Sequence, residues 1–491
     1  MSNDFNPDNV GLTAAHLIGG ERITTGDDLA VHRPSDGLAT KPIPAADEET
    51  VHRAVESSEK AFRTSGWAQA SPMDRAAVLH KWADLLDANR ERIARIEAVS
   101  STRPIDDLLA RDLVRAAGAL RYFAEWADKV EGQVFAGKAG ATTFAKPEPY
   151  GVVAAIAPFN FPAINAIWKS APALAVGNAV VLKPSEATPY SAVAIAELAL
   201  EAGLAPGLFN VVLGGGATGS ALVRHPLVRK ITFTGSSATG ARVMADAAMS
   251  GTKPVTLELG GKTPQLVMRD VHDVDAVATN IANGFLANSG QVCTAGSRLI
   301  APRNLRDQLL EKIIAIANGR RAGPTWASGN TLPPIINEKQ AKRIDDMIAQ
   351  TVSDGAEVIF GGSRVAEINS GAYYQPTILA NVPDTSVGFT DEFFGPVLSV
   401  YDYEDEDEGI AMANHPTYAL AASVYTDDLN KAMNLPDLLE AGTVWVNAHG
   451  RQPDFYTPQG GFNGSGFGKE MGRSGLESFL RRKTVLVNHG G

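Results

Sequence analysis

Apolar positions in the first part of the chain recur at the spacing of an amphipathic helix. The segments 52–67 and 73–99 carry apolar residues three and four positions apart, and a further run extends from about residue 106 to residue 130. This spacing places the apolar side chains on one face of a helix. The pattern therefore predicts that the first 120 residues are mostly helical.

From residue 150 onward, short β-branched runs alternate with helical segments. The first series of expected strands is GVVAAIA, AVVLKPS, FNVVLGG, KITFTGS and VTLELGG. The second series, after residue 261, is QLVMR, SRLIAP, AEVIFGG, LSVYDY, AASVYT and GTVWVN. The helices expected between them cover about 162–176, 188–202, 238–249, 273–287, 305–317 and 409–414. Such alternation predicts parallel sheets with right-handed crossovers, so we expect two α/β units.

Two segments fit neither α/β unit. They are the region near 131–149 and the last apolar run, KTVLVN, at 483–488. Apolar edge strands at the end of a chain are often buried in an oligomer. We therefore expect these segments to form strands that take part in subunit contacts.

The charge balance argues against nucleic-acid and membrane-surface partners. The 491 residues carry a formal net charge of −11, and such an acidic surface repels phosphate backbones and anionic lipids. The first ten residues lack a basic segment followed by an apolar one, so we expect no secretory signal and a cytoplasmic location. An uncharged run from Gly151 to Trp168 contains Pro158 and Pro162, which would break a membrane helix, so we interpret it as buried core.

The cysteine and histidine content predicts no metal site. The single cysteine excludes an intrachain disulfide and a multi-cysteine metal site, and the nine histidines are scattered without ligand spacing. An acidic run, Glu404–Glu408, is better explained as negative charge at the N-terminus of a following helix than as a metal site.

Cys293 is the first candidate for chemistry. A lone cysteine is most often a small buried hydrophobe. Here Gly290 precedes it and Gly296 follows, which suits a tight turn onto a helix N-terminus. Backbone amides there would stabilise a thiolate and make it a nucleophile. From spacing alone, the two interpretations remain equally open.

Glu258 and Asn160 are further candidates with open alternatives. Glu258 lies between two leucines at a strand end, where burial would raise its pKa towards that of a general base, unless it forms a salt bridge to Lys262. Asn160 lies between Pro158 and Pro162, which would hold its amide as an oxyanion donor, unless it caps a turn.

Two kinds of strand end suggest a nucleotide. Lys183 and Glu186 follow a predicted strand, where their side chains can contact ribose hydroxyls, and a glutamate there would repel a 2′-phosphate. The segments 213–219 and 233–240 are rich in glycine and open helices that can hold a pyrophosphate. Neither matches the G-x-G-x-x-G fingerprint, so each is weak by itself.

Taken together, seven motifs resemble the aldehyde dehydrogenase superfamily, of the non-phosphorylating, NAD(P)-dependent kind. In chain order they are PFNFP (158–162), KPSE (183–186), FTGSSATG (233–240), LELGGKTP (257–264), the GQVCTAG loop, EFFGPV (392–397) and GSGFGKEMG (464–472). The resemblance extends from about residue 17 to residue 487. It implies that Cys293 is the nucleophile, that Asn160 and the Cys293 amide form the oxyanion hole, and that Glu258 is the general base.

The resemblance also implies a cofactor cleft and a three-part fold. NAD is the expected cofactor, with NADP as the alternative. The residues implied to line the cleft are Ile156, Ala157, Pro158, Phe159, Lys183, Ser185, Glu186, Gly216, Phe233, Gly235, Ser236, Thr239, Leu259, Gly260, Glu392 and Phe394. The implied α/β fold has a Rossmann-like parallel-sheet cofactor domain (1–130 and 150–257), an α/β catalytic domain (258–465) and a small β oligomerisation flap (131–149 and 466–491).

Departures from the family pattern concern the substrate. The family's PFGG segment reads PQGG here, and Asn165 takes a position often held by a large apolar residue. We therefore expect a polar mouth, with Arg451 or His449 contacting a polar or anionic tail, as in a semialdehyde; a solvated loop arginine is the alternative. The residues implied to form the substrate pocket are Phe161, Asn165, Trp168, Val292, Thr294, His449, Arg451 and Gln459.

The expected reaction is oxidation of a small-molecule aldehyde to a carboxylic acid by a cysteine thioester that water hydrolyses. Two alternatives are a CoA-acylating relative, which Glu258 argues against, and a catalytically silent homologue, which should have lost Cys293, Asn160 or Glu258. By family analogy the protein is a homodimer or homotetramer.

Overall fold

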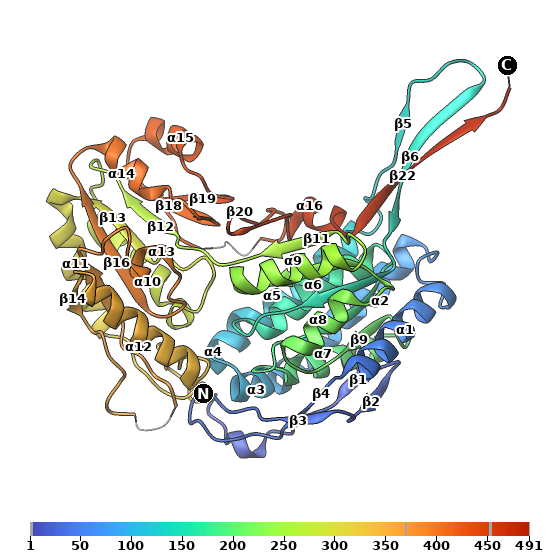
Figure 1. Ribbon diagram of the computed structural model, residues 1–491, viewed down its shortest axis with the longest axis horizontal. Coiled ribbons are helices and arrows are strands. Elements are labelled where there is room, and N and C mark those ends of the chain that lie inside the picture. The colour runs from blue at the N-terminus through green and yellow to red at the C-terminus, as the bar shows by residue number, and fades with distance from the viewer. Residues whose placement is uncertain (1–2, 369–370, 451–453, 491) are drawn as a thin grey trace.

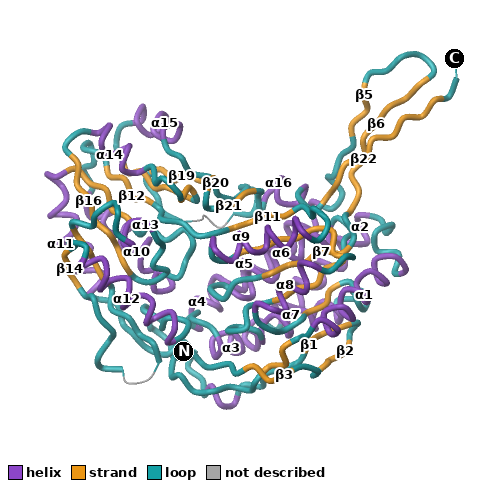
Figure 2. Tube along the Cα trace, viewed as in Figure 1, coloured by secondary structure: helices purple, strands orange, loops and turns teal. Residues whose placement is uncertain are grey.

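Two lobes and a projecting arm make up the molecule. The computed structural model describes residues 3–368, 371–450 and 454–490. Each lobe is built on a large β-sheet, and the narrow arm extends from one lobe, with the C-terminus near the tip of the arm (Figure 1). In Figure 2, helices flank the strands of both lobes, whereas the arm is made of strands and loop.

The first sheet has eight strands in the order β2-β1-β9-β8-β7-β10-β11-β21. The five strands from β9 to β11 are parallel, and antiparallel strands close both edges. The strands are β1 (His16–Ile18), β2 (Glu21–Ile23), β7 (Val152–Ile156), β8 (Ala179–Lys183), β9 (Phe209–Val211), β10 (Val228–Thr234), β11 (Val255–Glu258) and β21 (Gly466–Phe467). Strands β7 and β8 are buried along their whole length, because helices cover both faces; their sequences are therefore continuous apolar runs.

Helices pack on both faces of this sheet. One face carries α2 (Pro72–Ala88), α3 (Arg90–Ser100), α5 (Leu113–Trp126), α6 (Pro162–Ala175) and α7 (Tyr190–Glu201). The other carries α1 (Glu48–Thr64), α8 (Gly216–Arg224) and α9 (Ser237–Met249). Every residue of α6 and of β7 is buried, so most of the uncharged run from 151 to 168 is core, as the sequence predicts; Pro158, Phe159 and Phe161 are partly buried. Among the described residues, no helix is long and apolar enough to span a bilayer.

The second sheet has seven strands in the order β14-β15-β16-β13-β12-β18-β19, all parallel except the edge strand β14. They are β12 (Pro264–Val267), β13 (Arg298–Pro302), β14 (Glu357–Phe360), β15 (Thr377–Ala380), β16 (Val397–Tyr403), β18 (Ala421–Tyr425) and β19 (Thr443–Val446). The main helices of this lobe are α10 (Val274–Leu286), α11 (Arg303–Asn318), α12 (Glu338–Ser353), α14 (Glu406–Ala413) and α15 (Leu429–Leu438). The acidic run begins α14, with Asp405 as its N-cap, which confirms the predicted role.

The arm is a three-stranded antiparallel sheet. Strands β5 (Gln133–Phe135) and β22 (Leu480–Asn488) pair with opposite edges of β6 (Ala141–Pro149). The two segments that fit neither α/β unit are therefore strands that pair with each other.

Several local expectations were wrong. Four short strands, including β3 (Asp27–Leu29) and β4 (Ile43–Ala45), lie within the first 45 residues, which the sequence interpretation treated as mostly helical. The expected helix 73–99 breaks at Asn89, whose side-chain amide donates to the Leu85 carbonyl and caps α2. Residue 466, assigned to the arm, belongs to β21 of the first sheet. The division into domains stays a prediction.

Candidate active site

One continuous cavity of about 1830 Å³ is lined by residues of both lobes. It brings together every predicted site residue that the structure describes, with the exception of Gln459. Arg451 lies outside the described residues. Segments as distant in sequence as 156–168, 258–260, 292–294 and 392–394 thus share one wall.

Cys293 lies in a turn between a 3-10 segment, Ala287–Gly290, and strand β13. The amide of Ala295 donates to the Val292 carbonyl at 2.8 Å and closes this turn. The expectation that Cys293 begins a helix was wrong, because the chain after the turn enters a strand. The thiol is half-buried and faces the cavity, so a turn rather than a helix dipole sets its surroundings.

Glycines allow the Cys293 loop to contact neighbouring backbones directly. A Cβ atom on Gly290, which has a φ of +73°, would lie 1.9 Å from the Gly395 carbonyl oxygen. A Cβ atom on Gly261 would lie 2.7 Å from the Cys293 carbonyl oxygen. The loop is therefore held between the segment that follows Glu258 and the segment that contains Phe394, where no side chain fits.

Glu258 is the last residue of β11 and is 6% exposed. Its carboxylate lies beside Gly460, where a Cβ atom would be 2.8 Å from Oε1. The alternative salt bridge to Lys262 does not form. The Lys262 ammonium donates instead to the carbonyl oxygens of Gly388 and Asp391, at 2.9 and 2.7 Å.

A buried chain of hydrogen bonds orients the Asn160 amide. Asn160 Nδ2 donates to the Gln291 carbonyl at 3.0 Å, and Asn288 Nδ2 donates to the Asn160 carbonyl at 3.2 Å. Thr102 Oγ1 donates to Asn288 Oδ1 at 2.9 Å. Because Nδ2 carries two hydrogens, one remains for an oxygen in the cavity. The amide thus contacts the Cys293 loop rather than capping a local turn.

The sequence interpretation missed Asn288 and Thr102. Asn288 has a φ of +50°, a left-handed conformation that asparagine tolerates better than most residues. An asparagine close to Cys293 was the only local signal. Its partner Thr102 is 186 positions away, so nothing in the sequence joined the two.

The cofactor-binding candidates gather at strand ends and helix starts. Lys183 ends β8, and its ammonium donates to Glu186 Oε2 at 3.4 Å. Burial lowers the pKa of Lys183. Gly216 begins α8, and Ser236 is the N-cap of α9, where its hydroxyl accepts from the Thr239 amide. Two helix N-termini therefore face one cavity, which favours a pyrophosphate.

Phe394 and Glu392 of the second lobe also line the cavity. Phe394 packs edge-on against Phe159, with ring centroids 5.6 Å apart. Glu392 Oε1 accepts from the Gly261 amide at 3.3 Å, and burial raises the pKa of its carboxyl to about 7. These residues lie beside the glycines that hold the cysteine loop.

Glu470 also lines the cavity, and the sequence interpretation did not single it out. Its carboxylate forms an ion pair with the buried ammonium of Lys169 and accepts from Thr232 Oγ1 at 3.1 Å. Gln459, which was predicted for the pocket, pairs with Glu470 through both backbone groups at 2.8 Å instead. It thus supports Glu470 but does not line the cavity.

His449 lies in the cavity wall in a neutral form. Its ring shares a hydrogen bond with the Ser423 hydroxyl at 2.9 Å and packs against Trp445. Burial lowers its pKa to about 4, so the imidazole is uncharged at neutral pH. Of the two groups expected to contact an anionic tail, this one supplies no positive charge.

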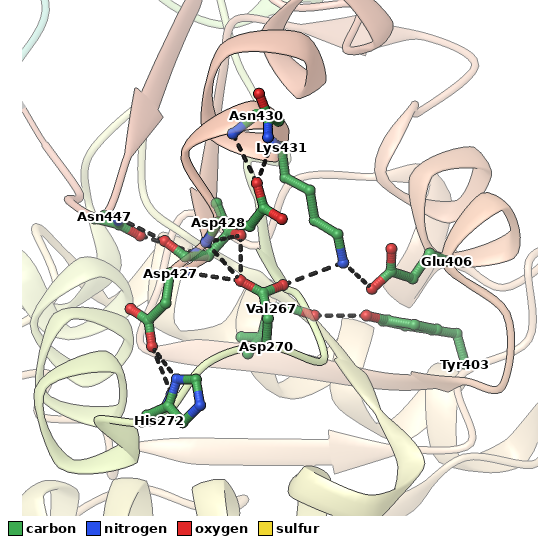
Figure 3. A network of polar contacts seen from close by, with 11 residues as sticks. Val267, Asp270, His272, Tyr403, Glu406, Asp427, Asp428, Asn430, Lys431 and Asn447 are labelled. Atoms are coloured by element: carbon green, nitrogen blue, oxygen red, sulfur yellow. Dashed lines mark hydrogen bonds and ion pairs between the residues drawn. The ribbon is translucent and has the colours of Figure 1, made fainter.

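A polar network at the carboxyl ends of β12, β18 and β19 fixes the loop that leads to His449. Asp270 accepts from the Thr426 hydroxyl, from the amides of Asp428 and Asp427 and from Lys431, and these bonds lower its pKa to about 2 (Figure 3). Asn447, just before His449, exchanges two hydrogen bonds with the neighbouring Thr426. Among the described residues, no group of histidine, cysteine and acidic side chains could hold a metal ion.

The sequence profile of the aldehyde dehydrogenase family matches residues 23–485. The chain belongs to the aldehyde dehydrogenase family. It is 38% identical to phenylacetaldehyde dehydrogenase of Pseudomonas fluorescens, over 97% of each chain. An indole-3-acetaldehyde dehydrogenase solved with NAD⁺ superposes with a TM-score of 0.95 and 36% identity, over 98% of each chain.

A third relative is the gamma-glutamyl-gamma-aminobutyraldehyde dehydrogenase of Burkholderia cenocepacia J2315. It is 36% identical, has a TM-score of 0.95 and covers 99% of this chain and 98% of its own. These relatives are named for aldehydes with aromatic and with polar tails, so the family alone does not select a substrate for this aldehyde dehydrogenase.

Replacing Gly290 by alanine should disturb the Cys293 loop more than the same change disturbs a glycine of positive φ in open surroundings. Gly203→Ala is the matched control, because Gly203 also has a positive φ but a Cβ atom there would have nothing within 4 Å. The control should cost about 1–2 kcal/mol of unfolding free energy, and Gly290→Ala about twice that or more. Urea unfolding measures the difference. Titration of the single thiol should show faster modification in Gly290→Ala, and equal stability losses would contradict the packing argument.

Proposed function

We propose that this enzyme oxidises an aldehyde to a carboxylic acid with NAD as the hydride acceptor, through a covalent intermediate on Cys293. The observation that carries the proposal is the meeting of Cys293, Asn160 and Glu258 in the cavity that the cofactor-binding candidates also line. A nucleophile, an oxyanion donor and a base in one cavity form the minimal set for acyl transfer to water.

The cavity fits a dinucleotide in the chemistry of its donors. Glu186 offers an acceptor for ribose hydroxyls, and the N-termini of α8 and α9 offer amides for the pyrophosphate. Glu392 supplies a second carboxylate, on the far lobe, for the other ribose. When bound, NAD supplies the acceptor for the hydride. The acidic Glu186 disfavours a 2′-phosphate, which supports NAD over NADP.

The chain's own residues perform the covalent chemistry. The Cys293 thiolate bonds to the aldehyde carbon, and the oxygen becomes an oxyanion that Asn160 and the Cys293 amide stabilise. Loss of the hydride converts this adduct to a thioester. Glu258 then takes a proton from water, which attacks the thioester, and Cys293 is released as the acid leaves. Burial of Glu258 and Asn160 limits competition from bulk solvent.

The thiol assignment predicts a burst that Cys293→Ser abolishes. On rapid mixing with NAD and an aldehyde, the wild type should form reduced cofactor, and Cys293→Ser should lose activity by about 10³-fold or more. Glu258→Gln should retain thioester formation but turn over slowly. Stopped-flow absorbance and mass spectrometry of the trapped adduct measure these steps. Turnover retained in Cys293→Ser would contradict the proposal. If the product with coenzyme A present were acyl-CoA rather than the acid, the CoA-acylating reaction would replace it.

Cofactor affinity should depend on the ionisation of Glu392. Its carboxyl, with a pKa of about 7, loses its proton as pH rises and only then is a full acceptor for ribose hydroxyls. The dissociation constant for NADH should therefore fall by about tenfold between pH 6 and pH 8. Glu392→Gln should flatten this profile, whereas Glu357→Gln on the exposed strand β14 should leave it unchanged. Fluorescence titration measures the constants; a pH dependence that persists in Glu392→Gln would contradict the assignment.

We propose that the aldehyde carries a polar tail. Asn165 and His449 face the cavity together with Asn283, which the sequence interpretation did not name. The amides and the neutral imidazole favour polar groups over a long alkyl chain, because burying their hydrogen-bonding atoms against apolar atoms costs free energy.

We also propose that the arm mediates assembly into a homodimer or homotetramer. Val134 and Leu486 are 79% and 66% exposed on a thin sheet that has solvent on both faces in the isolated chain. Apolar side chains on such a sheet favour a cover from another subunit.

Introducing charge on the arm should weaken assembly. Leu486→Lys should raise the subunit dissociation constant by about tenfold or more, because a buried unpaired charge is costly. Met73→Lys, at an exposed apolar residue of α2, is the control and should not change the mass of the oligomer. Sedimentation velocity over a concentration series measures both. An unchanged oligomer in Leu486→Lys would remove the arm from the interface.

A further inference from the structure

A cluster of charged side chains lines the cavity outside the machinery described above. It comes from the segment before α5, from α5 itself and from the loop that follows α11. Its members, here called the mouth cluster, are Arg103, Asp107, Arg111, Asp112, Arg115 and Arg320. None was among the predicted site residues. Four guanidinium groups face two carboxylates, so the mouth cluster has a formal charge of +2.

Both carboxylates of the mouth cluster are already engaged by arginines. Arg103 donates to Asp112 at 2.6 and 3.2 Å and to Asp107 at 3.3 Å. Arg111 pairs with the other oxygen of Asp107. The two carboxylates of the cluster are therefore paired with Arg103 and Arg111. Arg103 also stacks over the Phe161 ring, 4.6 Å from its centroid, which fixes this side of the mouth next to the predicted pocket.

Arg320 stands apart from these pairs. Its Nη2 donates to the neutral amide oxygen of Asn283, on α10. Its Nε atom is buried and has no hydrogen-bond acceptor among the described residues, and within residues 3–368, 371–450 and 454–490 no carboxylate oxygen lies within ion-pair distance of it. Burial lowers its pKa, and Asp107 is the acid that acts on it. Arg320 thus has a partly desolvated positive charge facing the cavity.

We propose that Arg320 binds a carboxylate at the far end of the aldehyde substrate, so that the enzyme prefers semialdehydes to neutral aldehydes of the same length. This inference rests on the proposed function and names its substrate class. A guanidinium presents a planar fork of donors that matches a carboxylate, and a carboxylate would satisfy both the buried Nε and the excess positive charge. The sequence interpretation assigned the contact with an anionic tail to Arg451 or His449; we assign it to Arg320.

The neighbouring groups support an anion over a cation. His449 is neutral, Asp107 and Asp112 are paired with Arg103 and Arg111, and Arg320 has no carboxylate oxygen within ion-pair distance among the described residues. An ammonium tail would therefore meet net repulsion, and a carboxylate would meet net attraction.

The test compares acids with amides that differ only in the tail. The probes are succinate semialdehyde and glutarate semialdehyde, each with its primary amide, and kcat and KM are measured with NAD. The wild type should favour the better acid over its amide by about 10- to 100-fold in kcat/KM. Arg320→Gln should remove most of this preference through KM, with the amide changed by less than about twofold. Arg320→Lys, which keeps the charge without the fork, should retain part of it.

Arg321→Gln is the matched control. Arg321 is next in sequence, donates to the Gly329 carbonyl of the same loop and does not line the cavity, so this variant should keep the acid-to-amide ratio. Thermal unfolding of each variant shows whether the loop has been damaged. A wild type that oxidises the amides without favouring the acids overturns this inference and leaves the proposed function standing. Equal losses for acid and amide in folded Arg320→Gln also overturn it, and so does a wild type that oxidises none of the four probes; the proposed function then fails only if other aldehydes also give no Cys293-dependent burst.

Discussion

Contact between backbones, without intervening side chains, holds the reactive loop of this enzyme. The Cys293 carbonyl lies against Gly261, and Gly290 lies against the Gly395 carbonyl, at separations that exclude a Cβ atom. A backbone has few alternative positions when it is packed in this way, whereas side chains can exchange rotamers. The same contacts place the segment that follows Glu258 against the Cys293 loop, and both residues line one cavity. The arrangement of the proposed nucleophile and the proposed base thus depends on glycines that perform no chemistry.

Hydrogen bonds, rather than backbone contacts, hold the proposed oxyanion donor. Asn160 is oriented by hydrogen bonds to Gln291 and Asn288, and Asn288 is itself fixed by Thr102 from the helical layer of the first lobe. Both loops that meet at the cavity are therefore tied to one network. A donor that is oriented before the substrate arrives has no reorganisation to undergo when charge develops, which is why such groups contribute strongly to acyl transfer.

The substrate end of the cavity differs in character from the catalytic end. Its charged side chains are largely paired with one another, and the nearby His449 is neutral because of its burial. Arg320 has only a neutral side-chain amide as its described hydrogen-bond partner. Its positive charge is therefore the local feature that an anion would meet. In the proposed mechanism, recognition of a tail and activation of the carbonyl can be separated, since the groups proposed to perform them share no hydrogen bond in the described structure.

The sequence by itself determined much of the succession of strands and helices in each α/β series, because apolar periodicity and strand-end motifs are local signals, but it missed α12, β15 and α15. It also determined that most of residues 151–168 are buried and located a large share of the residues that line the cavity. It also located Cys293, Glu258 and Asn160. Only the tertiary structure decided that Cys293 lies in a turn before β13, that Thr102 supports Asn288, and that Glu470 pairs with Lys169. These features depend on contacts between residues that are far apart in the chain. Burial also keeps His449 neutral, and the fold leaves Arg320 with a neutral amide as its described partner. Neither effect produces a pattern in the order of amino acids from which it could be predicted.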